Sequence, residues 1–134
     1  MKNNLAFIQD GLANHPAEAL FIVSVKNYKR SSMEFNFTVR DKLLNSFCDS
    51  PGVCNLLIDY AARKAGFEVI GCCFVHESET STHCRTVAKG FTVKVNIESH
   101  NLLDASYSCE VYSRTASDEI VIAESHGTLV KYDF

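Results

Sequence analysis

Neither a cluster of basic residues nor a long hydrophobic run occurs in this sequence of 134 residues. Lysine and arginine number 13 against 16 acidic residues, so the formal net charge is −3, and the isoelectric point lies near 5.9. Nucleic-acid-binding proteins concentrate positive charge on one face, and this balance argues against that class. The longest hydrophobic run near the start, Ala19–Val25, is too short to span a bilayer. We therefore expect neither a nucleic-acid partner nor a membrane-spanning segment.

The sequence also has no recognisable signal peptide and no disulfide framework. Asp10 and Glu18 precede the hydrophobic run, where a signal peptide would carry basic residues. Without export, the chain is expected in the cytoplasm, where its six cysteines stay reduced. Metal-ligand residue types gather in one stretch, but their spacing matches no common zinc pattern. That stretch contains Cys72, Cys73, His76, His83 and Cys84. We expect no bound metal and no cofactor.

The stretch Ser50–Ala65, SPGVCNLLIDYAARKA, predicts a central helix. Asp49 or Ser50 can cap its N-terminus, and Pro51 suits the first turn, where no backbone N–H is needed. Gly66 is expected to end it. Its apolar residues cover most of the circumference, which is typical of a buried helix rather than a surface helix. These residues are Val53, Cys54, Leu56, Leu57, Ile58, Tyr60, Ala61, Ala62 and Ala65.

Three polar residues interrupt this apolar surface, and they lie on one line along the helix. Asn55, Asp59 and Arg63 follow one another at intervals of four residues. A polar line on a buried helix needs an explanation, and we take Asp59 as the candidate functional residue. The simpler interpretation is an Asp59–Arg63 ion pair on the least buried line of the helix, and the sequence alone does not choose between the two.

The remaining segments predict an antiparallel sheet. Met33–Val39 alternates apolar and polar residues as a half-buried strand does, and Ala19–Lys26 is rich in β-branched and aromatic residues. Phe67–Val75 is ambiguous between a strand and a continued helix, with a weak preference for a strand, and His76–His83 is expected to be a polar loop. Three further segments read as a meander separated by turn signals: Arg85–Glu98, Ala105–Thr115 and Glu119–Tyr132.

These elements predict one α+β domain over residues 1–134, with a short N-terminal helix at about 4–13. A curved antiparallel sheet of about five to six strands would wrap around the central helix at about 50–65. One small sheet cannot cover a helix that is apolar on nearly every side. We therefore expect a homo-oligomer, a dimer or a tetramer, in which another subunit covers what remains.

The order strand–strand–helix–meander, with a sheet curled round one long helix, resembles the hotdog-fold acyl-CoA thioesterases of the 4-hydroxybenzoyl-CoA thioesterase and PaaI-like superfamily. The resemblance extends over roughly Ala19 to Tyr132, most of the chain. The strand Gly90–Glu98, GFTVKVNIE, is similar to the strand that follows the helix in that family. The fold implied is the hotdog fold.

The resemblance is sharpest at the start of the helix. The family opens this helix with a His-Gly-Gly motif and places an acidic residue seven positions after the second glycine. Here the matching stretch is Ser50-Pro51-Gly52, and Asp59 stands seven positions after Gly52. The family also carries an asparagine a few residues before the motif, and Asn45 lies near that place.

By this resemblance, the chain hydrolyses an acyl-CoA or another acyl thioester at a site on a subunit interface. Asp59 would be the general base or nucleophile, Gly52 would donate its N–H to the thioester carbonyl, and Asn45 would orient water or substrate. Other residues would bind the substrate: Ser50 in place of the motif histidine, Thr86 as the candidate from the partner subunit, and Arg85 and Lys89 as partners for the coenzyme A phosphates.

One departure from the family pattern keeps other functions open. Pro51 stands where the family has a donor glycine, and proline has no N–H. Losing one oxyanion donor typically costs ~10²–10³ in rate, which leaves a non-catalytic hotdog module that binds acyl-CoA or an acyl chain as the alternative. The third hypothesis is a cone-shaped fold of the nuclear-transport-factor type that binds or converts a small apolar ligand, although that fold places its long helices first.

Overall fold

The computed structural model describes residues 12, 15–40, 51–82, 90–114 and 119–132. Its six strands form one antiparallel sheet in the order β1-β2-β4-β5-β6-β3. A short helix, α2 (Pro16–Leu20), precedes the sheet, and the long helix α3 (Pro51–Ile70) follows the second strand. The strands are β1 (Phe21–Lys29), β2 (Ser32–Val39), β3 (Cys73–Thr82), β4 (Gly90–His100), β5 (Asp104–Arg114) and β6 (Glu119–Lys131).

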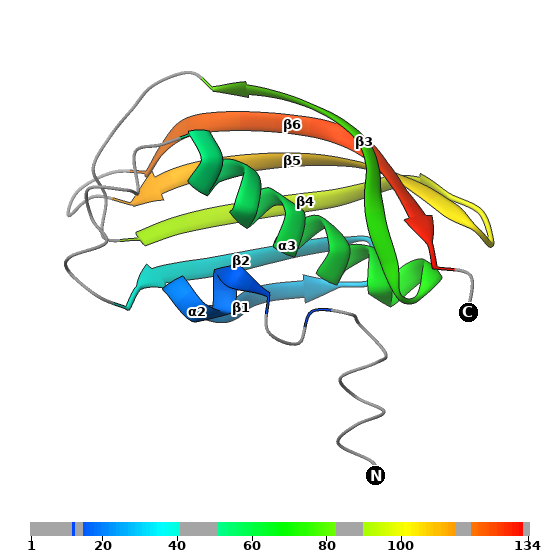
Figure 1. Ribbon diagram of the computed structural model, residues 1–134, viewed down its shortest axis with the longest axis horizontal. Coiled ribbons are helices and arrows are strands. Elements are labelled where there is room, and N and C mark those ends of the chain that lie inside the picture. The colour runs from blue at the N-terminus through cyan, green and yellow to red at the C-terminus, as the bar shows by residue number, and fades with distance from the viewer. Residues whose placement is uncertain (1–11, 13–14, 41–50, 83–89, 115–118, 133–134) are drawn as a thin grey trace, which may run out of the picture.

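The sheet curls around α3, which crosses its concave face (Figure 1). Leu57, Ala61 and Ala62 of α3 have no exposed surface, and they belong to one core with the inward-facing residues of the strands. The largest of those strand residues are Tyr107, Phe21, Phe35, Phe37, Phe91 and Leu129. The expected hotdog architecture of a curved sheet around one buried helix is confirmed, and the cone-fold hypothesis is wrong.

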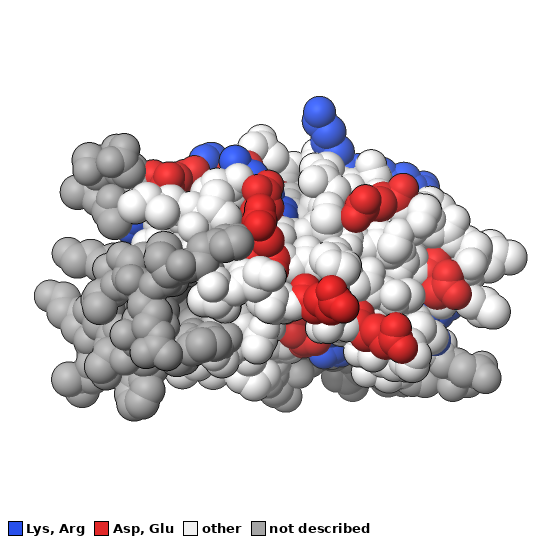
Figure 2. Space-filling model, turned by 90° about the horizontal axis from the view of Figure 1, so that it is seen from above, with Lys and Arg blue, Asp and Glu red and all other residues white. Residues whose placement is uncertain are grey.

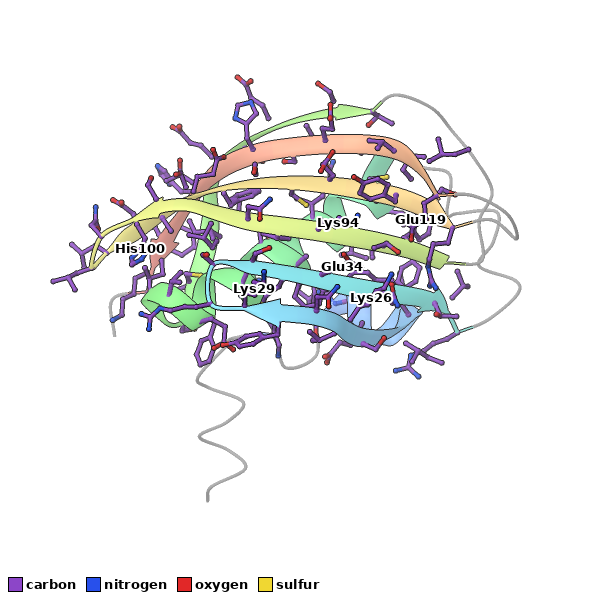
Figure 3. The ribbon with its side chains drawn as sticks, turned by 180° about the vertical axis from the view of Figure 1, so that it is seen from behind. Lys26, Lys29, Glu34, Lys94, His100 and Glu119 are labelled. Carbon is purple, nitrogen blue, oxygen red and sulfur yellow. The ribbon has the colours of Figure 1, made fainter. Side chains whose placement is uncertain are left out.

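The opposite face of the sheet is polar and carries ion pairs between strands (Figure 3). Glu34 on β2 lies between two lysines, with Oε2 3.2 Å from Lys26 Nζ and Oε1 4.0 Å from Lys94 Nζ. The Lys94 ammonium also lies 4.6 Å from the centre of the Tyr112 ring. The hydrophobic core therefore lies on the helix side of the sheet. Within the described residues, no helix is both long and apolar enough to cross a membrane.

The central helix is longer than the sequence predicted. The expected end at Gly66 is wrong, because α3 continues to Ile70 and Gly71 follows it with φ at +91°. The Gly71 N–H donates to the Phe67 carbonyl at 3.1 Å, which is the usual bond of a left-handed glycine after a helix. The weakly preferred strand at Phe67–Val75 is therefore wrong for its first four residues.

Gly66 is needed for close packing rather than for ending the helix. A Cβ at this position would lie 2.7 Å from Leu129 Cδ1 and 2.8 Å from Cys73 Sγ. Both neighbours are fully buried, so neither has free space to move into.

Replacing Gly66 by alanine is expected to destabilise the protein by about 1–2 kcal/mol, because overpacking outweighs the better helix propensity of alanine. Gly52→Ala is the matched control, since Gly52 is exposed in the first turn of the same helix. Urea unfolding of both variants measures the effect. Equal stability of Gly66→Ala and the wild type would show that the core accommodates the methyl group.

The predicted polar loop at His76–His83 is also wrong over the part that the structure describes. His76 to Thr82 continues β3, which pairs with β6 from Cys73↔Lys131 to Thr82↔Ala123. Its side chains from His76 to Thr82 are exposed, because β3 is an edge strand of the sheet. An edge strand exposed on both faces needs no apolar alternation, so periodicity does not reveal it.

The N-terminal part of the chain differs from the expectation in one further respect. Ala19 and Leu20, predicted as the start of a strand, belong to α2, and β1 instead runs from Phe21 to Lys29. His15 caps α2 and Pro16 occupies its first position, which is the usual arrangement at a helix start. The helix predicted at about 4–13 lies outside the described residues apart from Leu12, which is not helical.

Candidate active site around Asp59

An open cavity of about 510 Å³ lies between the N-terminal half of α3 and the edge strand β3. It forms where the polar line of the helix faces the sheet, so two of the three residues on that line border it. The cavity is lined by Asn55, Ile58 and Asp59 from α3, Val75, Ser78 and Thr80 from β3, and Tyr107 from β5. The cavity thus brings one carboxylate and three hydroxyl groups together beside two aliphatic side chains.

Asp59 is held by two donors on a single carboxylate oxygen. His15 Nε2 lies 2.8 Å from Asp59 Oδ2, and Arg63 Nη1 lies 3.4 Å from the same atom. The side chains of His15 and Arg63 are 7% and 15% exposed, whereas that of Asp59 is 37% exposed. Among the described residues, no hydrogen bond reaches the second oxygen, Oδ1. The carboxylate is therefore anchored on its inner side and open on the cavity side.

These neighbours decide the ionisation of Asp59. Burial raises the pKa of its carboxyl group, but the hydrogen bond from His15 and the positive charge of Arg63 together hold the pKa below its usual value of 3.8. Asp59 is consequently a carboxylate at neutral pH. A carboxylate can accept a proton from water or attack a carbonyl carbon directly.

The lowered pKa predicts how acid affects stability. A carboxyl group whose pKa is lower in the folded than in the unfolded state stabilises the protein above the unfolded pKa, and that contribution is lost as the pH falls through the folded pKa. We expect the free energy of unfolding of wild type to exceed that of Asp59→Asn by about 1 kcal/mol or less at about pH 6. The difference should be smaller at about pH 3, where the carboxylate begins to be protonated. Urea unfolding at both values measures this difference, and an unchanged gap contradicts the assignment.

The predicted ion pair between Asp59 and Arg63 is present, and Arg63 also forms a hydrogen bond to the backbone of β3. Its Nε donates to the Cys73 carbonyl at 3.1 Å, which joins the middle of α3 to the start of β3. Asp59 therefore compensates a mostly buried cation that holds two elements together. The ion pair explains the contact between Arg63 and Asp59 Oδ2. It does not explain why an open cavity borders the carboxylate.

Gly52 lies in the first turn of α3, where backbone N–H groups have no acceptor within the helix. The residue is exposed, so its N–H is available as a donor. At 1.5 Å per residue, the separation of seven positions from Gly52 to Asp59 corresponds to about 10 Å along the helix axis. The two groups therefore lie on the same helix but two turns apart.

Five predicted site residues, Asn45, Ser50, Arg85, Thr86 and Lys89, lie outside the described residues. The structure adds others that sequence reasoning missed. Asn55 stood on the polar line without being selected. His15 is 44 residues away from Asp59 in the chain, and only the His-Pro pair typical of a helix start marks it in the sequence.

Two buried cysteines of the described residues, Cys73 and Cys109, do not offer a competing nucleophile. Cys73 and Cys109 are free thiols, and burial raises the pKa of the Cys109 thiol. Burial raises the pKa of Cys73 to about 12, so this thiol is protonated and unreactive at neutral pH. No group of three or more His, Cys, Asp or Glu side chains suited to a metal ion occurs in the part of the chain that the structure describes.

No protein-family model matches this sequence, and no curated protein sequence matches it either. Solved structures do match its fold. A thioesterase family protein from Silicibacter pomeroyi is 16% identical, with a TM-score of 0.77 over 90% of this chain and 92% of that one. The E. coli PaaI protein from the phenylacetic acid degradation operon is 15% identical, with a TM-score of 0.76 over 98% and 92%. A hypothetical thioesterase from Streptococcus pneumoniae, solved with coenzyme A, is 10% identical, with a TM-score of 0.73 over 89% and 94%.

These matches are matches of the whole fold, with TM-scores of 0.73 to 0.77. The identities are too low to transfer a residue's role, but the coverage is nearly complete in both directions. The chain has the hotdog fold of these thioesterase-family structures.

Proposed function

We propose that the protein hydrolyses an acyl thioester, an acyl-CoA in the first instance, with Asp59 as the general base or nucleophile. The observation that carries the proposal is the Asp59 carboxylate, ionised at neutral pH, anchored through Oδ2 and bordering a cavity. It projects from the central helix of a hotdog fold whose solved neighbours include thioesterase-family proteins. Similarity to those proteins supports thioester hydrolysis as the reaction class. The Asp59 carboxylate is the group that would activate water or attack the thioester carbonyl carbon.

The reaction needs one water molecule and no cofactor. As a base, Asp59 takes a proton from water while the hydroxide oxygen bonds to the carbonyl carbon; the C–S bond then breaks, and the thiolate takes up the proton. As a nucleophile, Oδ1 bonds to the carbonyl carbon and displaces the thiolate, and water then cleaves the resulting anhydride. Both routes yield a free acid and a thiol and return Asp59 as a carboxylate.

Coenzyme A is the proposed carrier of the acyl group, because one neighbour was solved with it bound. Its phosphates are negatively charged, and acidic side chains predominate in the middle of the face that Figure 2 shows. Strands β3 and β6 carry three exposed glutamates, Glu77, Glu79 and Glu124. The phosphates should therefore lie away from this face, and Arg85 and Lys89 stay the proposed partners.

A second copy of the chain is proposed to complete the site. An oxyanion donor must lie about 3 Å from the carbonyl oxygen while the attacking oxygen lies about 3–3.5 Å from the carbonyl carbon. The Gly52 N–H and the Asp59 carboxylate of one helix are too far apart for both contacts. A homo-oligomer that brings Gly52 of a second copy toward Asp59 supplies both, and β3, which is an edge of the sheet in the described part of the chain and borders the cavity, is the proposed side of contact.

A second candidate function is favoured by Pro51. The structure places Pro51 at the first position of α3, so the helix start lacks one N–H. If that group is required for turnover, the cavity binds an acyl-CoA or an acyl chain without cleaving it. Binding without release of thiol distinguishes this function from hydrolysis.

Thiol release from a panel of acyl-CoAs tests the proposed function. The panel spans short, long and aromatic acyl groups, and matched acyl-pantetheines test whether the nucleotide part of coenzyme A is recognised. We expect release to depend on the enzyme for at least one acyl group. Saturable binding of acyl-CoA without thiol release would instead support the non-catalytic module.

A further inference from the structure

We propose that His15 is a positioning residue for Asp59: its imidazole holds Oδ2 of the carboxylate so that Oδ1 is left for the substrate. The inference rests on the proposed function of Asp59 and adds to that site a residue from near the N-terminus, 44 positions before Asp59. Three observations carry it, namely the fixed ring, the hydrogen bond at each ring nitrogen, and the unequal surroundings of the two carboxylate oxygens.

The His15 ring is rigidly placed. The residue is 8% exposed, and its ring meets that of Tyr60 edge to face, with 5.2 Å between the centroids. Tyr60 is itself held by a hydrogen bond from its hydroxyl to Glu18 Oε1 at 2.7 Å. A ring packed in this way loses little entropy when it forms a further contact, so its position can determine that of a neighbour.

The two ring nitrogens have different partners, and these partners assign the tautomer. Nδ1 accepts a hydrogen bond from the Ala17 N–H at 3.0 Å, which caps α2, so a lone pair occupies that nitrogen. The ring proton therefore lies on Nε2, which donates to Asp59 Oδ2 at 2.8 Å. A proton added at Nδ1 would break the cap. The cap of a short helix thus keeps the imidazole as a donor toward Asp59.

The two carboxylate oxygens of Asp59 differ in their hydrogen bonds. His15 and Arg63, the two ionisable groups that act on Asp59, both approach Oδ2, and no described residue bonds to Oδ1. Two donors on one oxygen oppose rotation of the carboxylate and leave Oδ1 as the oxygen that a bound thioester or its attacking water can meet. Loss of such orientation, without loss of the group itself, can cost on the order of 10²-fold in rate.

A purely structural role for His15 is the competing explanation, because the same ring caps α2. Two substitutions separate the roles. His15→Asn places an oxygen where Nδ1 was, so it keeps the cap, but it is too short to reach Asp59. His15→Gln places an amide nitrogen near the position of Nε2, so it keeps a donor to Asp59 and gives up the cap.

We expect His15→Asn to lower kcat by about 10²-fold with KM nearly unchanged, because substrate contacts remain while the orientation of Asp59 is lost. His15→Gln should keep most of the wild-type kcat despite a lower melting temperature. The proposal is overturned if the decrease in kcat in the two variants is proportional to their decrease in melting temperature. It is also overturned if His15→Asn keeps the kcat of wild type.

Titration of the Asp59 carboxyl carbon by NMR gives a readout that does not depend on turnover. The pKa of Asp59 should rise toward its ordinary value in His15→Asn and stay lowered in His15→Gln. An Asp59 pKa in His15→Asn equal to that of wild type refutes the positioning role. If wild type releases no thiol from any acyl-CoA, the proposed function fails, and this titration alone decides whether His15 positions the carboxylate.

Discussion

Subunits carrying Asp59→Asn and subunits carrying Gly52→Asp, each inactive alone, are expected to recover about a quarter of wild-type activity when refolded together in equal amounts. In a shared site, Asp59 of one copy works with the Gly52 N–H of the other. Half of the dimers in such a mixture are mixed, and each mixed dimer has one site without either substitution. Gly52→Asp suits the helix start, where acidic groups are stabilising, but its carboxylate repels the developing oxyanion.

The control is the double variant, carrying both substitutions on one chain, refolded with an equal amount of wild type. A shared site predicts about a quarter of full activity, because every mixed dimer then has two damaged sites, whereas a site within one chain predicts about half. Two affinity tags confirm that mixed dimers form. No recovery in the first mixture, with mixed dimers present, would show that one chain supplies the whole site.

Asp59→Asn is expected to lower kcat for acyl-CoA hydrolysis by about 10²–10⁴-fold, because an amide neither takes up a proton nor attacks a carbonyl. Folding should change little. The asparagine oxygen can still accept from His15 Nε2, and an ion pair with a carboxylate that is 37% exposed contributes about 1 kcal/mol or less. Steady-state thiol release and urea unfolding measure the two effects separately.

Glu68→Gln is the matched control for this variant. Glu68 is also a carboxylate on α3, and its Oε2 accepts a hydrogen bond from the Tyr28 hydroxyl at 2.8 Å. It does not border the cavity. The control should keep wild-type turnover. A turnover of Asp59→Asn equal to that of Glu68→Gln would reduce Asp59 to the ion-pair partner of Arg63.

The core of the fold could be predicted because its signals are local. The apolar circumference of residues 53–65 identified a buried helix, and the alternation in β2, in β5 and in β4 from Val93 to Ile97 matches their observed burial. Asp59 stood out for the same reason, as a charge on an apolar helix. Its nearest cation, Arg63, was also predictable because the pair is separated by one helical turn.

The errors arose where distant contacts override local signals. Gly66 looked like a helix end, but its missing Cβ accommodates Leu129, a residue far along the chain. Exposed β3 looked like a loop, because its side chains from His76 to Thr82 are exposed and polar residues suffice there. His15 could not be assigned to the site, because its partner lies 44 residues away and no short pattern encodes that contact.

Crystals of Asp59→Asn grown with an acyl-CoA that wild type cleaves would test the central claim most directly, since the variant should hold the substrate intact. The account predicts that the thioester carbonyl carbon lies near the side-chain amide nitrogen of the substituted residue 59, which takes the place of the free Oδ1 of wild type, inside the cavity between α3 and β3. It also predicts that the Gly52 N–H of a second copy points to the carbonyl oxygen. A thioester bound elsewhere on the molecule, or facing away from residue 59, would contradict the account.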